Sequence, residues 1–171
     1  MEKESATPQT GGGRFREGTT MDVAVLLENA RPQVLDEAYA ALESSHISHY
    51  EAAGEPLTRQ RLGDLHDLVV DAIRRRDLTE VTAYSHGVAE ERFHSGFDIS
   101  EVQTAFNCLE ESMWRRLVAD EPQGELAEAI GLLSTVLGAG KDALARTYVS
   151  LAGDRHVTSL DLSALFHGAG S

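Results

Sequence analysis

The chain has 171 residues, 42% of them hydrophobic and 25% charged, a balance typical of one globular domain. Fifteen Lys and Arg against 28 Asp and Glu give a formal net charge of −13, and so acidic a chain argues against nucleic-acid or membrane-surface partners. One cysteine excludes an internal disulfide and a multi-cysteine zinc site, and no secretory signal is evident, so the sequence predicts a cytoplasmic protein.

The predicted elements are all helices. Residues 1–20 are polar, contain three consecutive glycines and are predicted to form a disordered tail. From Met21 onward apolar residues recur at spacings of three and four, and no stretch alternates as a strand would. The expected helices cover residues 21–53 with a kink or split at Pro32, 58–76, 78–95, 98 or 100 to 119, and 125–151.

Local signals define the ends of these helices. Thr58 is predicted to cap the second one, after the breakers around Pro56. Asp98 and Glu101 have the spacing of a capping box, and Gly153 is the expected stop of the last helix. The sequence therefore predicts an all-α bundle of five to six helices over residues 21–153, followed by a tail over residues 154–171.

The last predicted helix carries a narrow apolar stripe. Its members are Leu126, Ile130, Leu133, Leu137, Leu144, Tyr148 and Leu151. Such a stripe is typical of a bundle core or of a helix-pair dimer seam. Gly138 and Gly140 interrupt it, and they either permit a close helix approach or only weaken the helix.

Three histidines, His46, His49 and His66, lie on or beside predicted apolar faces. A buried histidine is usually neutral and hydrogen-bonded, and the alternative is a ligand for a small molecule or for a haem iron. The Glu-x-x-His spacing of di-iron bundles occurs twice, but the phasing of the second pair and the lack of bridging carboxylates argue against a metal site.

Arg92 projects from the apolar face of its predicted helix, beside Val81 and Val88. A cation in that position needs a partner, and Glu110 and Glu101 are the candidates for a structural ion pair. The alternative is that Arg92 anchors an anionic ligand.

A continuous series of short motifs then carries a family resemblance. The motifs are Tyr84-x-His86-Gly87, Glu91-Arg92-Phe93, Gly96-Phe97-Asp98-Ile99-Ser100-Glu101-Val102, Phe106-x-x-Leu109 and Met113-Trp114. They resemble the N-terminal sensor domain of RsbR-type proteins, the RsbT co-antagonists of the bacterial stressosome. The resemblance covers roughly residues 21–153.

The resemblance implies a globin-like helical fold without haem, a homodimer, and a sensing or scaffolding role in stress signalling. RsbR-type proteins continue into a STAS domain, which is not expected in this chain, so its output would pass through a STAS-domain protein, an anti-sigma factor or a kinase. The candidate residues for a ligand pocket or a structural ion pair are Arg92, His86, Glu110, His66, His46 and His49.

The function that the sequence favours is thus a non-enzymatic regulatory module that controls a sigma factor or a phosphorelay. A haem-binding gas sensor, with His46, His49, His66 or His86 as the proximal ligand, is the first alternative. A small helical enzyme with a carboxylate or metal site is the second.

The C-terminal tail contains four large apolar residues, a composition that a solvated tail does not normally have. They are Leu160, Leu162, Leu165 and Phe166. Either this segment folds back onto the bundle or a dimer mate, or it is a docking motif for a partner protein.

Overall fold

The computed structural model describes residues 22–159, with side chains up to residue 153. The predicted N-terminal tail and the apolar residues Leu160, Leu162, Leu165 and Phe166 lie outside this range. Every regular element of the described residues is a helix, which confirms the predicted all-α class. The helices are α1 (Val23–Asn29), α2 (Arg31–Ser44), α3 (Ser48–Ala53), α4 (Glu55–Arg75), α5 (Thr79–His94), α6 (Ile99–Asp120) and α7 (Leu126–Ser159).

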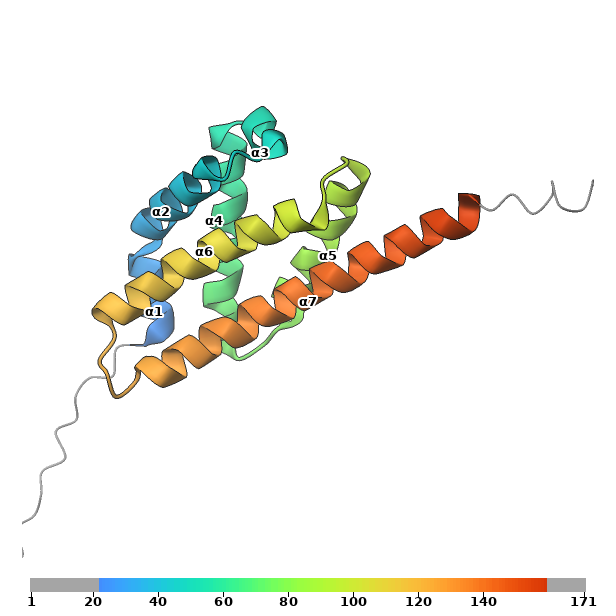
Figure 1. Ribbon diagram of the computed structural model, residues 1–171. Coiled ribbons are helices and arrows are strands. Elements are labelled where there is room, and N and C mark those ends of the chain that lie inside the picture. Colours follow the sequence, from blue (N-terminus) through green and yellow to red (C-terminus); the bar gives the residue numbers. More distant parts are fainter. Residues whose placement is uncertain (1–21, 160–171) are drawn as a thin grey trace, which may run out of the picture.

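The helices pack as a bundle in which α2, α6 and α7 lie side by side (Figure 1). Helix α4 crosses behind this row and contacts α1, α2, α5 and α7. Helix α5 has its most extensive contacts with α7, and the C-terminal turns of α7 extend past the rest of the bundle (Figure 1). No helix in the described range has the length and apolar character needed to cross a membrane.

Two prolines begin helices instead of breaking them. Pro32 lies in the first turn of α2 and Pro56 in the first turn of α4. The amides of a first turn have no partner within the helix, so proline loses no hydrogen bond there. The predicted split near Pro32 is confirmed, whereas the predicted cap at Thr58 is wrong, because Thr58 is a buried residue inside α4.

A further break separates α2 from α3, so the first predicted segment forms three helices. The hydroxyls of Ser44 and Ser45 both donate to the carbonyl oxygen of Ala41, and such bonds compete with the helical ladder. His46 then adopts a left-handed conformation with φ of 50°. The apolar periodicity continues across this break, which is why the sequence pattern did not reveal it.

The capping box at the start of α6 is confirmed. The Asp98 side chain accepts from the backbone N–H of Ser100, and Glu101 accepts from the backbone N–H of Asp98. The predicted stop at Gly153 is wrong, because α7 continues to Ser159. A glycine costs a helix about 1 kcal/mol relative to alanine, which is too little to end it without a left-handed turn.

The apolar stripe of α7 lies inside the bundle of a single chain. Leu133, Leu137, Leu144 and Tyr148 are all buried there. The described residues therefore use the middle of this stripe as a core, whereas Leu126, Ile130 and Leu151 toward its ends are only partly buried.

Gly140 allows the close approach of α5 to α7. A Cβ atom at position 140 would lie 3.0 Å from Ser85 Oγ and 3.4 Å from Phe106 Cε1. The Ser85 hydroxyl is buried and donates to the carbonyl oxygen of Val81, so it is not free to move away. A Cβ atom at Gly138 would meet nothing within 4 Å, so only one of the two predicted glycines serves this packing.

We predict opposite responses to alanine at these two glycines. Gly138→Ala should raise the free energy of unfolding by up to about 1 kcal/mol through helix propensity. Gly140→Ala gains the same propensity but overpacks the α5–α7 contact, at a cost of roughly 1–3 kcal/mol. Urea unfolding followed by circular dichroism measures both, and equal stabilisation by the two substitutions would contradict the close-approach account.

Candidate functional site

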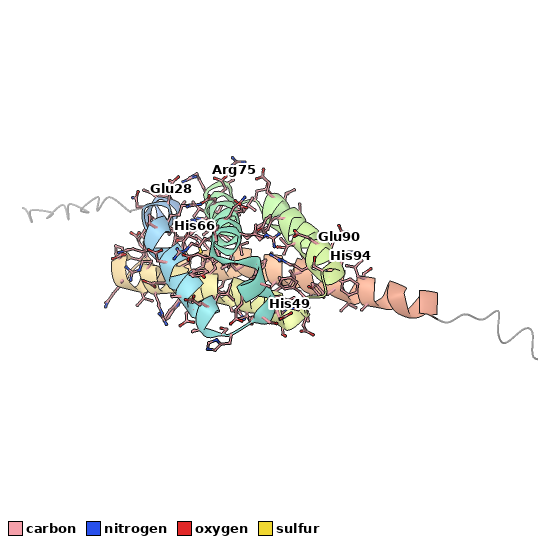
Figure 2. The ribbon with its side chains drawn as sticks, turned by 90° about the horizontal axis from the view of Figure 1, so that it is seen from above. Glu28, His49, His66, Arg75, Glu90 and His94 are labelled. Atoms are coloured by element: carbon pink, nitrogen blue, oxygen red, sulfur yellow. The ribbon has the colours of Figure 1, made fainter. Side chains whose placement is uncertain are left out.

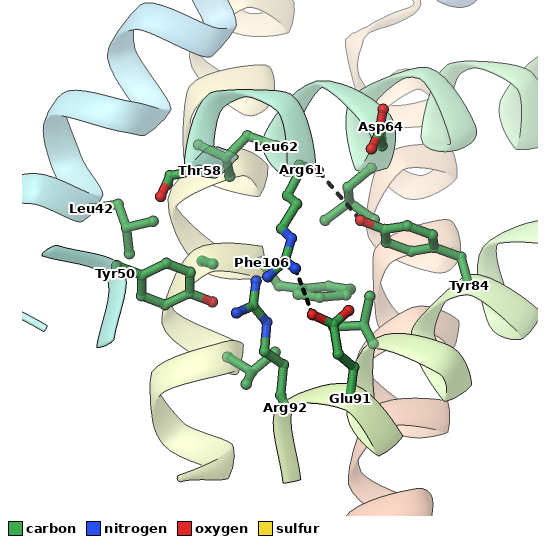
Figure 3. A pocket seen from close by; sticks show the side chains of 14 residues that line it. Leu42, Tyr50, Thr58, Arg61, Leu62, Asp64, Tyr84, Glu91, Arg92 and Phe106 are labelled. Carbon is green, nitrogen blue, oxygen red and sulfur yellow. Dashed lines mark hydrogen bonds and ion pairs between the residues drawn. The ribbon is translucent and has the colours of Figure 1, made fainter. Parts of the chain in front are cut away.

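A cavity of about 190 Å³ lies between α3, α4, α5 and α6, and Leu42 of α2 also lines it (Figure 3). Its walls are mostly apolar, and they include Leu42, Leu62, Leu65, Val102, Ala105 and Phe106. Two arginines, Arg61 from α4 and Arg92 from α5, direct their guanidinium groups into it (Figure 3). The cavity therefore has mostly apolar walls, and two guanidinium groups point into it.

Arg92 is buried, as the helix phasing predicts, with only 6% of its surface exposed. Its guanidinium carbon lies 4.4 Å from the centre of the Phe97 ring and 5.6 Å from that of Tyr50. No carboxylate among the described residues pairs with it, and its guanidinium makes no hydrogen bond there. Aromatic faces attract a cation but accept no conventional hydrogen bond, so no described side chain accepts from the N–H donors of Arg92.

Neither predicted partner reaches Arg92. Glu110 pairs with Lys141 of α7, at 2.5 Å between Oε2 and Nζ. Glu101 accepts from the Asp98 backbone and lies 2.9 Å from Nδ1 of His49. The predicted structural ion pair of Arg92 with Glu110 or Glu101 is therefore wrong, because other groups hold both carboxylates.

Arg61 is only partly neutralised. Its Nη2 donates to Oε1 of Glu91 at 2.5 Å, with Glu91 54% exposed at the outer side of the cavity. Its Nη1 is buried without a hydrogen-bond partner. Asp64 also lines the cavity, but its carboxylate points away from both guanidinium groups (Figure 3).

Three hydroxyl groups complete the polar lining. The hydroxyl of Thr58 is buried without a partner, and that of Tyr50 points toward the guanidinium groups (Figure 3). The hydroxyl of Tyr84 donates to the carbonyl oxygen of Arg61 at 3.4 Å. Burial raises the pKa of Tyr50 and raises the pKa of Tyr84 to about 12, so both phenols remain protonated donors at neutral pH.

The structure does not bring the predicted histidines into this cavity. His46 is exposed, and its Nδ1 lies 3.6 Å from Oε1 of Glu51. His49 stacks on Phe97 from outside the lining, and His86 contacts the Thr147 hydroxyl on the exposed side of α5. In Figure 2 His49 and His66 lie on different parts of the bundle.

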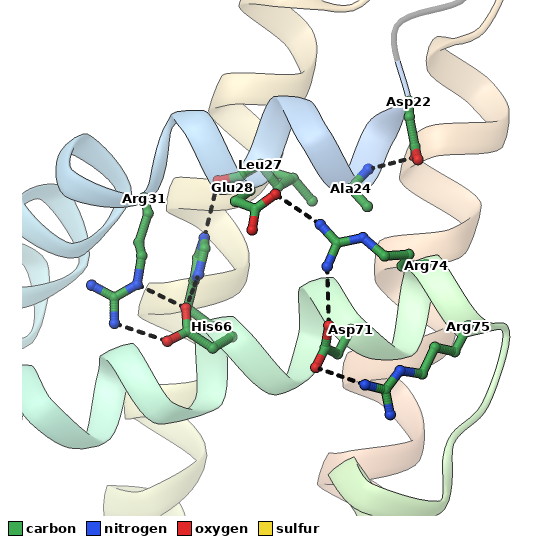
Figure 4. A network of polar contacts seen from close by, with 10 residues as sticks. Asp22, Ala24, Leu27, Glu28, Arg31, His66, Asp71, Arg74 and Arg75 are labelled. Carbon is green, nitrogen blue, oxygen red and sulfur yellow. Dashed lines mark hydrogen bonds and ion pairs between the residues drawn. The ribbon is translucent and has the colours of Figure 1, made fainter.

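His66 instead belongs to a polar network that joins α1 and α2 to α4 (Figure 4). Its Nε2 donates to the carbonyl oxygen of Leu27 at 3.2 Å, and its Nδ1 lies 3.1 Å from Oδ1 of Asp67. Arg31 donates to both oxygens of Asp67. Partial burial opposes ionisation of Asp67, but the hydrogen bonds from Arg31 and His66 outweigh it and lower its pKa. His66 is thus a structural residue.

Sequence reasoning missed Arg61, Tyr50 and Thr58. A signal for Arg61 was present, because Thr58, Arg61 and Leu65 are spaced by three and four and share a helix face. Tyr50 falls on the continued apolar stripe of the first predicted helix, but the break at residue 46, which determines where its helix lies, hid its place in the cavity.

A buried carboxylate lies away from the cavity, at the end of α6. Glu121 is 6% exposed, and neither of its carboxylate oxygens has a hydrogen-bond partner. Burial, together with the neighbouring negative charge of Glu125, raises the pKa of Glu121. This carboxylate therefore opposes folding when it is ionised.

Fold and site together define an all-α domain with an internal, cation-lined cavity. No group of three or more metal-ligating side chains occurs among the residues that the structure describes. The chain belongs to the family described as the RsbT co-antagonist protein rsbRD N-terminal domain, whose model matches residues 32–156. This is a regulatory domain family of stress signalling, as the sequence resemblance implied. Neither the curated proteins nor the solved structures contain a match.

We predict that Glu121→Gln stabilises the protein in a pH-dependent manner. Because the folded-state pKa of Glu121 is raised, its contribution favours folding at low pH and is lost as the pH rises through that value. The glutamine variant should therefore melt above the unmodified protein at about pH 7.5, and the difference should shrink toward about pH 4. The exposed Glu90→Gln is the control, and an equal shift in both variants would contradict this account.

Proposed function

We propose that the chain is a non-enzymatic regulatory module of bacterial stress signalling that acts through protein contacts on sigma-factor or phosphorelay control. The observation that carries this proposal is the family match over residues 32–156, which spans α2 to α6 and most of α7. The cavity lies within the matched region. We add no haem to the proposal, since no histidine is among the residues that line the cavity.

The family description names a co-antagonist of RsbT, so an RsbT-type protein is the partner that we propose first. A STAS-domain protein, an anti-sigma factor or a kinase is the wider class. Exposed apolar side chains support a contact role: Trp114 and Val118 lie one turn apart on α6, 44% and 45% exposed, and Val149 on α7 is 72% exposed.

We also propose a homodimer, and the part of α7 around Val149 supports it best. The middle of the α7 stripe is already buried within one chain, so it offers a second copy little surface. The C-terminal turns of α7 extend beyond the other helices (Figure 1), and Val149 on this helix is 72% exposed. Two-fold symmetry would bring this helix against its own copy.

We predict that Val149→Asp disrupts the dimer, because it places a charge at the proposed contact. Light scattering at about 50 µM should give a dimer mass for the unmodified chain and a monomer mass for this variant. Val25→Asp, on α1 outside the family match, is the control and should stay dimeric. A monomer for the unmodified chain would contradict the dimer proposal.

Partner binding is tested by co-elution of the full chain with RsbT-type and STAS-domain proteins encoded in the same genome. The regulatory proposal expects a complex with at least one of them at about 50 µM. Trp114→Ala should weaken that complex if α6 forms the contact. Absence of a complex with every such protein would contradict the proposed function.

A further inference from the structure

We propose that the cavity between α3, α4, α5 and α6 binds a small organic carboxylate, with Arg92 as its principal anchor. The inference goes beyond the regulatory role and rests on the geometry of the cavity alone. It does not depend on which protein the domain contacts.

The charge balance of the cavity is the first argument. The guanidinium groups of Arg61 and Arg92 both point into it, and Glu91 is the only carboxylate that pairs with either of them within the described residues. Asp64 lines the cavity as well, but its carboxylate points away from both guanidinium groups (Figure 3), so Arg92 is left without a directly paired carboxylate in a largely apolar surrounding. Burying a cation without an anionic partner is unfavourable, and a bound monoanion would remove that penalty.

The unused hydrogen-bond donors are the second argument. Arg92 has no acceptor among the described residues, and Arg61 Nη1 and the Thr58 hydroxyl are both buried without a partner. The phenol of Tyr50 points toward the same space and stays protonated (Figure 3). A ligand that binds here has to accept hydrogen bonds from several donors. An ionised carboxylate does so, because its two oxygens are acceptors only.

The shape of the cavity favours an organic acid over a bare inorganic anion. About 190 Å³ is more space than a carboxylate group alone fills, and side chains such as Leu62, Val102 and Phe106 line the rest. These walls suit a short hydrocarbon or a single aromatic ring. A doubly charged phosphate would exceed the charge of the single unpaired guanidinium, and the nearby Asp64 and Glu91 and the net charge of −13 disfavour it further.

The ion pair of Arg61 and Glu91 lies where the cavity is most exposed to solvent, and we take this side as the entrance for a ligand. Their side chains are 27% and 54% exposed, whereas Arg92 behind them is 6% exposed. A ligand that enters here meets Arg61 first and then reaches Arg92, where its carboxylate can form a two-pronged contact with the guanidinium.

The unpaired state of Arg92 also has a consequence for stability. Substitution of an ion-paired arginine leaves a buried carboxylate without its partner and strongly destabilises a protein. At Arg92 no carboxylate would be left behind, so Arg92→Met should keep the empty protein folded with a melting temperature no lower than that of the unmodified chain. The same variant should lose the ligand.

The test uses the full chain in Tris chloride, free of carboxylate and phosphate buffers. The probes are sodium benzoate and sodium butyrate, with benzamide and butyramide as neutral analogues, and with sodium phosphate and sodium chloride at matched ionic strength. We expect the two carboxylates to raise the melting temperature saturably, by at least about 4 °C. The amides, phosphate and chloride should have little effect.

Variants then assign the effect to Arg92. Arg92→Met should weaken benzoate binding, measured by calorimetry, by roughly tenfold to a hundredfold. Arg92→Lys keeps the charge without the planar fork and should give an intermediate loss. Arg115→Met is the control, since Arg115 is 56% exposed and pairs with Glu111 on the surface, and it should bind benzoate normally.

Several results would overturn the proposal. No response to either carboxylate contradicts it directly, as does an equal response to the amides, which would indicate an apolar cavity only. A response to phosphate as large as that to benzoate would contradict the organic-acid assignment. Arg92→Met that unfolds, or that binds benzoate as tightly as the unmodified chain, would show that Arg92 is not the unpaired anchor.

Discussion

The cavity of this domain is built around one guanidinium that lies among aromatic rings. Arg92 leaves α5 and lies over Phe97, which follows the α5–α6 turn, and near Tyr50 of α3. These three side chains come from parts of the chain that are distant in sequence and meet beside the cavity. The Arg92 guanidinium has no anionic partner there. Because aromatic rings attract a cation without accepting its hydrogen bonds, its N–H donors remain available to a bound anion.

The position of this cavity suits a regulatory domain of stress signalling. Five helices, α2 to α6, contribute to its wall, and α5, which carries both Arg92 and Glu91, packs along α7 through the close approach at Gly140. A ligand that repositions Arg92 would act on α5, and α5 would act on the long helix whose end lies beyond the bundle (Figure 1). Coupling of this kind needs a shift between two packed arrangements of α5 and α7.

The sequence revealed the helices well, since their apolar periodicity and the capping box at Asp98 are local signals. It also placed Arg92 on a buried face, because helix phasing is a local property. That no carboxylate pairs with Arg92 could not be derived in this way. Glu110 was available on a neighbouring helix, but Lys141 holds it, and only the three-dimensional packing of α6 against α7 determines that choice. The break at His46 was missed because the apolar spacing continues across it, and the left-handed backbone of His46 has no counterpart in that spacing.

The most direct test of this account is the side-chain NMR signal of the Arg92 Nε–H group, assigned with the Arg92→Lys variant. The account predicts a signal shifted by the ring of Phe97 in the empty protein, without the downfield position of a carboxylate-bonded arginine. Sodium benzoate should move it downfield, and benzamide should not. A signal that already has the carboxylate-bonded position, or that does not respond to benzoate, would contradict the claim that Arg92 is unpaired and binds an organic carboxylate.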